Sequence, residues 1–257
     1  MKNSLSVVAA IAFITVAAPH AALAQGDEIQ VYDGGLAPVG VFNLTLHNNF
    51  TPKGVKEPAF PGAVISDRSL NGVPEWAYGV TNWFEAGLYM PLYSVDKDQG
   101  AVLDGFKLRT LFAVPDGDKR RFVYGVNFEF SWNSKTWDTT RITSEIRPII
   151  GWHLPNVDVI VNPIFDTSYD GAKNLIFAPS TRVAFTVKPQ WQFAVEEYSD
   201  YGAVRHFSSN DQAHQIFAVV DHSGKFLDME AGIGVGLTDS SDKVQLKLIL
   251  SRDLNKR

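Results

Sequence analysis

In the stretch RFVYGVNFEFSW, residues 121–132, large apolar side chains alternate with small or polar ones from Tyr124 onward. The aromatic residues and Val126 occupy the even positions, and Gly125, Asn127, Glu129 and Ser131 lie between them. Successive side chains of a strand point to opposite faces, so this stretch predicts a β-strand with one apolar and one polar face. The same period recurs along the chain, whereas no stretch shows apolar residues recurring three and four apart. We expect an all-β fold.

The alternating segments are about twelve in number, and each is long enough to cross a bilayer at a tilt. The predicted strands are 40–50, 74–82, 84–95, 103–114, 121–132, 139–152, 156–167, 177–187, 190–200, 213–222, 226–237 and 243–254. Short and long links alternate between them, and the two longest loops, 51–74 and 201–212, fall on one side. Bacterial outer-membrane barrels show this parity. We therefore predict an antiparallel up-and-down transmembrane β-barrel of about twelve strands.

Alternation alone fits both a soluble barrel, whose apolar face points inward, and a membrane barrel, whose apolar face meets lipid. The tryptophans near predicted strand ends favour the membrane barrel, because they fit an interfacial aromatic girdle. A closed sheet also leaves no unpaired strand edge in the membrane. We favour an outer-membrane barrel over a soluble periplasmic β protein.

Six basic and eight acidic side chains fall on the polar face, which a membrane barrel turns towards its lumen. These candidate lumen-lining residues are Glu85, Lys107, Arg109, Glu129, Arg141, Glu145, Arg147, Asp158, Asp166, Arg182, Glu196, Asp228, Glu230 and Lys247. Such a lumen fits either a polar channel or a core of mutual ion pairs with little open bore. The sequence leaves both interpretations open.

The first 24 residues have the pattern of a cleaved signal peptide. Lys2 precedes an apolar run over 5–18, and Ala22-Leu23-Ala24 has the small-x-small form of a cleavage site. We expect the mature chain, 25–257, to be one barrel domain that a Sec-type signal directs to the outer membrane of a Gram-negative cell. Its expected partners are outer-membrane lipid and the barrel-assembly machinery.

Composition narrows the function classes. The chain has 23 basic and 28 acidic residues, so nothing predicts a nucleic-acid partner. It contains no cysteine, and its histidines lack metal-ligand spacing, so we expect neither disulfides nor a metal site. No cofactor motif is present, because the glycines of 232–236 are not followed by a helix.

One pair of residues raises a catalytic alternative. His206 and Ser208, in the sequence RHFSSN, have the spacing with which outer-membrane lipid hydrolases place a base and a nucleophile on one face. The pair falls in a predicted loop without an obvious orienting acid. The main expectation is therefore a protein that is not an enzyme, and a lipid hydrolase is the alternative.

Several stretches resemble a family. AYGVTNWFEAGLY, FVYGVNFEFSW, SEIRPIIGW, VNPIFDTSYDG and LKLILSRDL resemble a widespread group of poorly characterised proteobacterial outer-membrane β-barrel proteins, similar to those described as MetA-pathway phenol-degradation or transporter proteins. The resemblance covers essentially the whole mature chain and implies a link to the uptake of aromatic compounds, without a defined active residue. Such barrels commonly end in an aromatic residue, whereas here Leu254 holds the lipid-facing parity and three polar residues follow.

Together these patterns predict a passive outer-membrane channel or binding protein for small solutes, with aromatic compounds among the candidates. A closed structural barrel is a further alternative.

Overall fold

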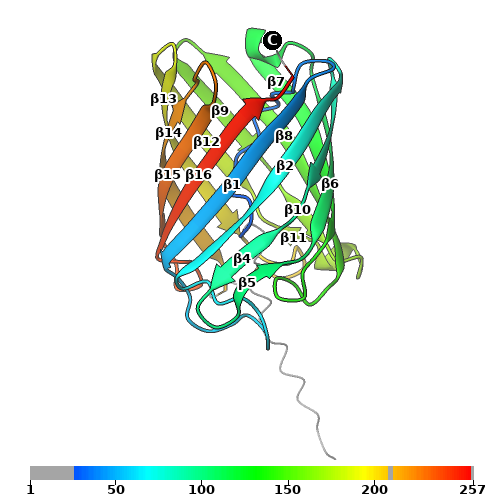
Figure 1. The fold of residues 1–257 in the computed structure, drawn as a ribbon, viewed down its shortest axis with the longest axis vertical. Helices are drawn as coiled ribbons and strands as arrows, with labels where there is room; N and C mark the ends of the chain where they lie inside the picture. The colour runs from blue at the N-terminus through cyan, green and yellow to red at the C-terminus, as the bar shows by residue number, and fades with distance from the viewer. Residues whose placement is uncertain (1–25, 208–210, 256–257) are drawn as a thin grey trace, which may run out of the picture.

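The computed structural model describes residues 26–207 and 211–255. Twelve strands of these residues close into one antiparallel barrel (Figure 1). In chain order they are β1 (Phe42–Lys53), β2 (Ser69–Thr81), β3 (Phe84–Tyr89), β6 (Phe106–Ala113), β7 (Phe122–Trp132), β8 (Ile142–Leu154), β9 (Val157–Asn162), β12 (Ser180–Lys188), β13 (Trp191–Asp200), β14 (Ala213–His222), β15 (Asp228–Gly236) and β16 (Val244–Asp253). Each strand pairs with its neighbours in sequence, and β1 closes the barrel by pairing with both β2 and β16. The predicted fold class is confirmed.

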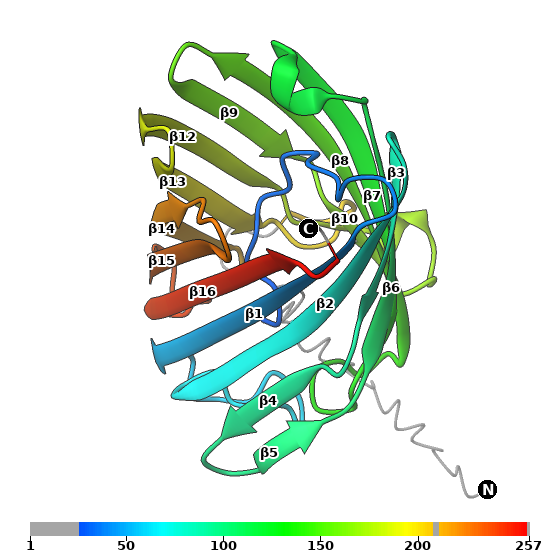
Figure 2. The same ribbon diagram turned by 45° about the horizontal axis from the view of Figure 1, so that its top comes forward.

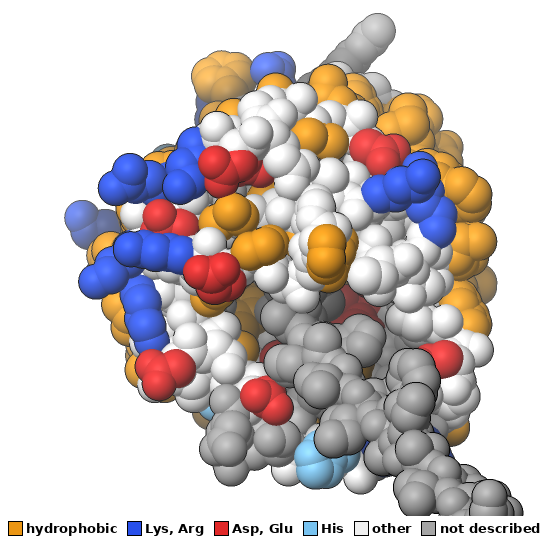
Figure 3. Space-filling view, turned by 90° about the horizontal axis from the view of Figure 1, so that it is seen from below, with side chains coloured by type: hydrophobic (Ala, Val, Ile, Leu, Met, Phe, Trp, Pro, Cys, Tyr) orange, Lys and Arg blue, Asp and Glu red, His pale blue; other side chains and the backbone are white. Residues whose placement is uncertain are grey.

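The links between these strands alternate as predicted. Links 82–83, 114–121, 155–156, 189–190 and 223–227 lie at one end of the barrel, together with the start of β1 and the end of β16. We call this the turn end, and it is uppermost in Figure 1. The other links, which include the longest ones, lie at the opposite end, which we call the loop end. Figure 3 looks onto the loop end, where basic and acidic side chains are interspersed on the rim.

Two predicted strands are interrupted where a proline enters them. The strand predicted over 84–95 ends at Tyr89, before Pro91, and the chain turns away into the hairpin of β4 (Tyr93–Asp96) and β5 (Gly100–Leu103). The strand predicted over 156–167 divides at Pro163 into β9 and β10 (Phe165–Thr167), and β10 pairs with β8 and with β11 (Ile176–Phe177). Proline cannot donate a hydrogen bond to the ladder. Two 3₁₀ turns, η1 (Gly117–Lys119) and η2 (Ala172–Asn174), lie in links.

The longest predicted loop is shorter in the structure. The link expected over 51–74 covers only 54–68, because β1 continues to Lys53 and β2 begins at Ser69.

The two faces of the wall are inverted relative to a soluble protein. In β7 the large apolar side chains Phe122, Tyr124 and Phe128 are exposed, whereas Asn127 and Glu129 are buried. Aromatic side chains contact one another near both ends of the wall, as Phe84 and Phe112 do near the turn end and Phe106 and Trp132 do near the loop end. An exposed apolar band between aromatic belts is the surface that a lipid bilayer requires. No helix among the described residues is long and apolar enough to cross a membrane.

Candidate functional site: the lumen and its N-terminal segment

Residues 26–41 precede the first strand and run through the inside of the barrel (Figure 2). We call them the lumen segment. Near the loop end, the Gly26 carbonyl accepts a hydrogen bond from Asn49 Nδ2. At the turn end, Val41 lies beside Gly79 of β2. The segment therefore passes along the barrel from one end to the other before the chain enters β1.

At the end of this segment Gly40 and Val41 are held by backbone hydrogen bonds to β2, and Ala37 N donates to the Glu85 carboxylate. Gly40 N donates to the Gly79 carbonyl at 2.8 Å, and Gly79 N donates to the Val41 carbonyl at 3.1 Å. Glycine is required at position 79, because a Cβ there would lie 2.3 Å from the carbonyl oxygens of Ala37 and Pro38. This half of the segment is in effect an addition to the sheet.

Residues 26–32 are held by side chains instead, and Tyr32 is the clearest case. Its backbone N–H donates to Asn162 Oδ1 at 2.7 Å, and Asn162 Nδ2 donates to its carbonyl at 2.9 Å. One side chain of β9 thus satisfies both backbone groups of a buried residue. The Tyr32 hydroxyl also hydrogen-bonds the Tyr89 hydroxyl, and the Arg147 guanidinium lies 4.4 Å from the Tyr32 ring centre.

Three basic side chains of the wall also bind this half. They are Lys107, whose Nζ lies 2.7 Å from Asp27 Oδ2, Arg147, which donates to the Gln30 carbonyl at 3.1 Å, and Lys247, which donates to the Ile29 carbonyl at 3.3 Å. These bases come from β6, β8 and β16, so strands on different sides of the barrel bind the segment.

A tight turn separates the two halves. Gly34 has φ +86°, which a side chain rarely adopts, and a Cβ there would lie 3.1 Å from Val123 Cγ1. Gly35 N donates to Asp33 Oδ1 at 2.8 Å, the hydrogen bond of an Asx turn. The sequence DGG therefore lets the chain bend while it stays close to the wall.

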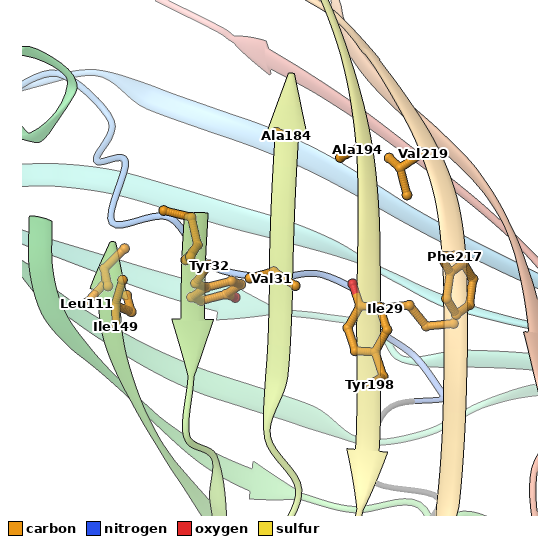
Figure 4. Close-up of a cluster of buried hydrophobic side chains, with 11 residues drawn as sticks. Ile29, Val31, Tyr32, Leu111, Ile149, Ala184, Ala194, Tyr198, Phe217 and Val219 are labelled. Atoms are coloured by element: carbon orange, nitrogen blue, oxygen red, sulfur yellow. The ribbon is translucent and has the colours of Figure 1, made fainter. Parts of the chain in front are cut away.

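Apolar side chains on the lumen face of several strands pack against the segment. Figure 4 shows Ile29, Val31 and Tyr32 pointing towards the surrounding strands. The wall residues of this cluster are Leu111, Ile149, Ile160, Ala184, Ala194, Tyr198, Phe217 and Val219. We call them the apolar face. They come from β6, β8, β9 and β12 to β14. A segment with apolar side chains can therefore remove apolar surface from water inside the barrel.

Charged residues line much of the rest of the lumen. On the strands from β2 to β10, Arg109 pairs with Glu75 and Glu85, Lys107 lies 3.7 Å from Glu129, and Arg147 binds both carboxylate oxygens of Glu145. Asp166 of β10 lies opposite Glu145. We call this set the acidic face, because its five carboxylates outnumber its three bases. His47 lies beside it, with Nε2 3.1 Å from Glu75 Oε2.

A second network lies on β12 to β16. Arg182 pairs with Glu196 and Asp221, and lies 3.6 Å from Glu230. Lys247 pairs with Glu196 and Glu230. The Tyr198 hydroxyl donates to Glu196 at 2.7 Å.

The structure brings most of the predicted lumen-lining residues together in these two networks. The ten found there with a partner of opposite charge are Glu85, Lys107, Arg109, Glu129, Glu145, Arg147, Arg182, Glu196, Glu230 and Lys247. They are mostly buried, so mutual ion pairs fill a large part of the lumen wall.

Of the four remaining predicted residues, Asp166 lies opposite Glu145, and the other three lie nearer the two ends of the barrel. Arg141 pairs with Asp104 at the loop end and, by hydrogen bonding to it, lowers the pKa of that carboxyl. Asp158 pairs with His153 next to the turn end. Asp228 is exposed at the start of β15 and accepts a hydrogen bond from Gly224 N in the adjacent turn.

Several site residues were not among the predicted ones. They are Asp27, Glu28, Tyr32, Glu75, Tyr89, Asn162 and Asp221. Glu75 shares a face with Glu85 in the alternation of 75–85, so the sequence pattern could have placed Glu75 in the lumen. No periodic pattern could have placed Asp27 and Glu28 in the lumen, because both residues precede the first strand.

The catalytic alternative gains no geometric support. His206 is exposed in the link 201–212, and Ser208 lies outside the described residues. Within the described part of the chain, no carboxylate lies within ion-pair distance of the His206 ring. The described residues also contain no group of three or more His, Asp or Glu side chains that could hold a metal ion.

The geometry defines a class: a closed twelve-stranded up-and-down barrel with an apolar exterior, a charged interior and a chain segment inside. No protein-family model matches the chain, and no curated protein is similar to it. The resemblance to a MetA-pathway family therefore stays a prediction.

Solved structures do match. An outer membrane channel from Pseudomonas putida F1 is similar over 88% of this chain and 100% of that one, with a TM-score of 0.59 and 13% identity. The KdgM porin is similar over 83% and 99%, with a TM-score of 0.54 and 8% identity. The CymD monoaromatic hydrocarbon channel is similar over 85% and 90%, with a TM-score of 0.50 and 8% identity. At such identities the likeness establishes the fold.

Proposed function

We propose that the protein is an outer-membrane channel for small solutes, and that the lumen segment closes it in the structure described above. The observation that carries the proposal is a chain segment that crosses the barrel lumen from end to end and is held largely by side chains. The apolar exterior supports a membrane location, with the turn end in the periplasm and the loop end outside.

The solute class is argued from the lumen and from the neighbours. Outer-membrane channels and a porin are among the similar structures, and one is described as a monoaromatic hydrocarbon channel. In this chain the apolar face would offer a small aromatic body the contacts that Ile29 and Val31 now make.

Planar-bilayer recording tests this function. The mature full-length chain should show little steady conductance. A release variant, Tyr32→Ala with Asn162→Ala, should open often, because the substitutions remove the Asn162 hydrogen bonds and the Tyr89 contact without changing any charge. A variant without residues 26–35 should conduct steadily. Asn174→Ala, a substitution in a loop-end turn, serves as the control and should behave like the parent.

A closed structural barrel is the alternative outcome. If both altered chains insert, keep heat-modifiable gel migration and still conduct no more than the parent, the channel proposal is wrong.

A further inference from the structure

Three carboxylates form a row across neighbouring strands of the lumen wall. Glu129 of β7 lies directly opposite Glu145 of β8, and Glu145 lies directly opposite Asp166 of β10. Like charges directly opposite each other destabilise a sheet, so such a row is unusual as a purely structural feature.

The bases near this row do not balance it. Arg147 is engaged by Glu145. Arg109 lies opposite Glu129 in the β6–β7 ladder but is bound by Glu75 of β2 and Glu85 of β3. Lys107 is closer to Asp27 of the lumen segment than to Glu129. Asp166 Oδ2 is buried and has no hydrogen-bond partner among the described residues. Carboxylates are therefore in excess over bases at the loop-end half of the wall.

The lumen segment adds to this surplus. Its Glu28 side chain is 3% exposed, and neither carboxylate oxygen has a hydrogen-bond partner among the described residues. The nearest base is Arg147, at 3.8 Å. Asp27 adds a second carboxylate on the same side. The lumen is consequently acidic with the segment inside it, and its wall stays acidic if the segment leaves.

The second network does not offset this excess of carboxylates. It contributes two bases, Arg182 and Lys247, against Glu196, Asp221 and Glu230. In the described residues of the acidic face and this network together, five bases meet eight carboxylates. Carboxylates inside a narrow pore attract cations and repel anions, and a low-dielectric wall strengthens that field.

We propose that the lumen of the open channel selects cations, and that its organic solutes are small amines with an apolar body. This inference rests on the proposed function. The acidic face would pair with the ammonium group, and the apolar face, which shares β6 and β8 with it, would receive the hydrocarbon part. Aromatic rings can assist, since Lys107 lies 5.8 Å from the Tyr89 ring centre and Lys247 lies 5.7 Å from that of Tyr198.

The test uses the full-length release variant, Tyr32→Ala with Asn162→Ala, in a planar bilayer between unequal KCl concentrations. The reversal potential should have the sign of cation selectivity. Adding Glu129→Gln and Asp166→Asn should move it towards zero, because two lumen carboxylates become neutral. The matched control, Glu57→Gln with Asp118→Asn, changes two exposed carboxylates outside the lumen and should leave it unchanged.

Liposome swelling with matched aromatic solutes tests the solute class. Benzylammonium should enter faster than benzyl alcohol, and benzoate should enter most slowly. A conducting variant with a zero or anion-selective reversal potential overturns this inference and leaves the channel proposal standing. Faster entry of benzoate than of benzylammonium also overturns it. The absence of any conductance or solute entry overturns both proposals.

Discussion

Residues 26–32 lie inside the lumen, whereas residues 36–41 lie at its turn end, and the two sets are held by different groups. The first set is bound by Asn162 and by three basic side chains of the wall. In the second set Gly40 and Val41 pair with the backbone of β2, and Ala37 N donates to Glu85. Side-chain contacts can be released without breaking the sheet, but backbone pairing is part of the sheet. For the proposed channel we expect residues 26–32 to be the movable part of the lumen segment and residues 36–41 to be its anchor.

The largest effect is expected from Arg147→Met. The substitution removes both hydrogen bonds to Glu145, the bond to the Gln30 carbonyl and the contact with the Tyr32 ring. Breaking a buried pair leaves an uncompensated charge and costs about 3–5 kcal/mol. Urea unfolding of the refolded barrel in liposomes should show that loss. An unchanged unfolding free energy would mean that Arg147 does not hold the acidic face.

The anchor is tested by Gly79→Ala. The added Cβ would lie 2.3 Å from two backbone oxygens of the segment, so residues 36–41 should separate from β2 at a cost of about 1–3 kcal/mol. Limited proteolysis should then cut within 36–41 while the barrel stays heat-modifiable. Gly117→Ala is the control, because its Cβ would make only an ordinary contact of 3.5 Å with Val123. Equal cutting of the two variants would refute the anchor.

Asn162→Leu tests the movable part alone. The side chain keeps its approximate volume but loses both hydrogen bonds to Tyr32, and an unsatisfied buried backbone group costs about 1–3 kcal/mol. Since the backbone-bound half is untouched, we expect a higher frequency of channel opening with little change in heat-modifiable migration. If the opening frequency matches that of the parent, Asn162 does not hold the lumen segment in the closed channel.

The smallest effect is expected at the loop-end rim, from Arg141→Met. The pair with Asp104 is partly exposed and contributes about 0.5 kcal/mol or less. Because the folded-state pKa of Asp104 lies below its unfolded-state value of about 3.9, the pair stabilises the fold above that pH. The contribution is lost as pH falls through the folded-state pKa. Unfolding at pH 7 and under strongly acidic conditions should show a small difference from the parent that disappears in acid.

The wall strands could be predicted from the sequence because their environment has two faces. Lipid on one side and a charged lumen on the other impose a period of two, as in β7, and this fixed most strand boundaries closely. The alternation takes no account of the missing N–H of Pro91 and Pro163, where two predicted strands break. A proline alone does not predict a break, because β2 and β8 continue through Pro74 and Pro148.

The lumen segment could not be predicted in the same way. Residues 26–32 are surrounded by the wall on several sides, so acidic and apolar side chains follow one another without a period. Asp27 and Glu28 acquire their role only from Lys107 and Arg147, which are distant in sequence and close in space. Asn162 could not be predicted for the same reason, because its partner Tyr32 is 130 residues away in the sequence.

The most direct test of the account measures whether residues 26–32 lie inside the barrel. The chain has no cysteine, so the labelling rate of a single introduced cysteine reports how accessible that position is. Ile29 is 3% exposed and Val39 is 60% exposed. With a bulky, membrane-impermeant maleimide added to the folded protein in detergent, Val39→Cys should react rapidly and Ile29→Cys should be protected until the barrel is unfolded. Equally rapid labelling of both in the folded barrel would contradict a lumen filled by this segment.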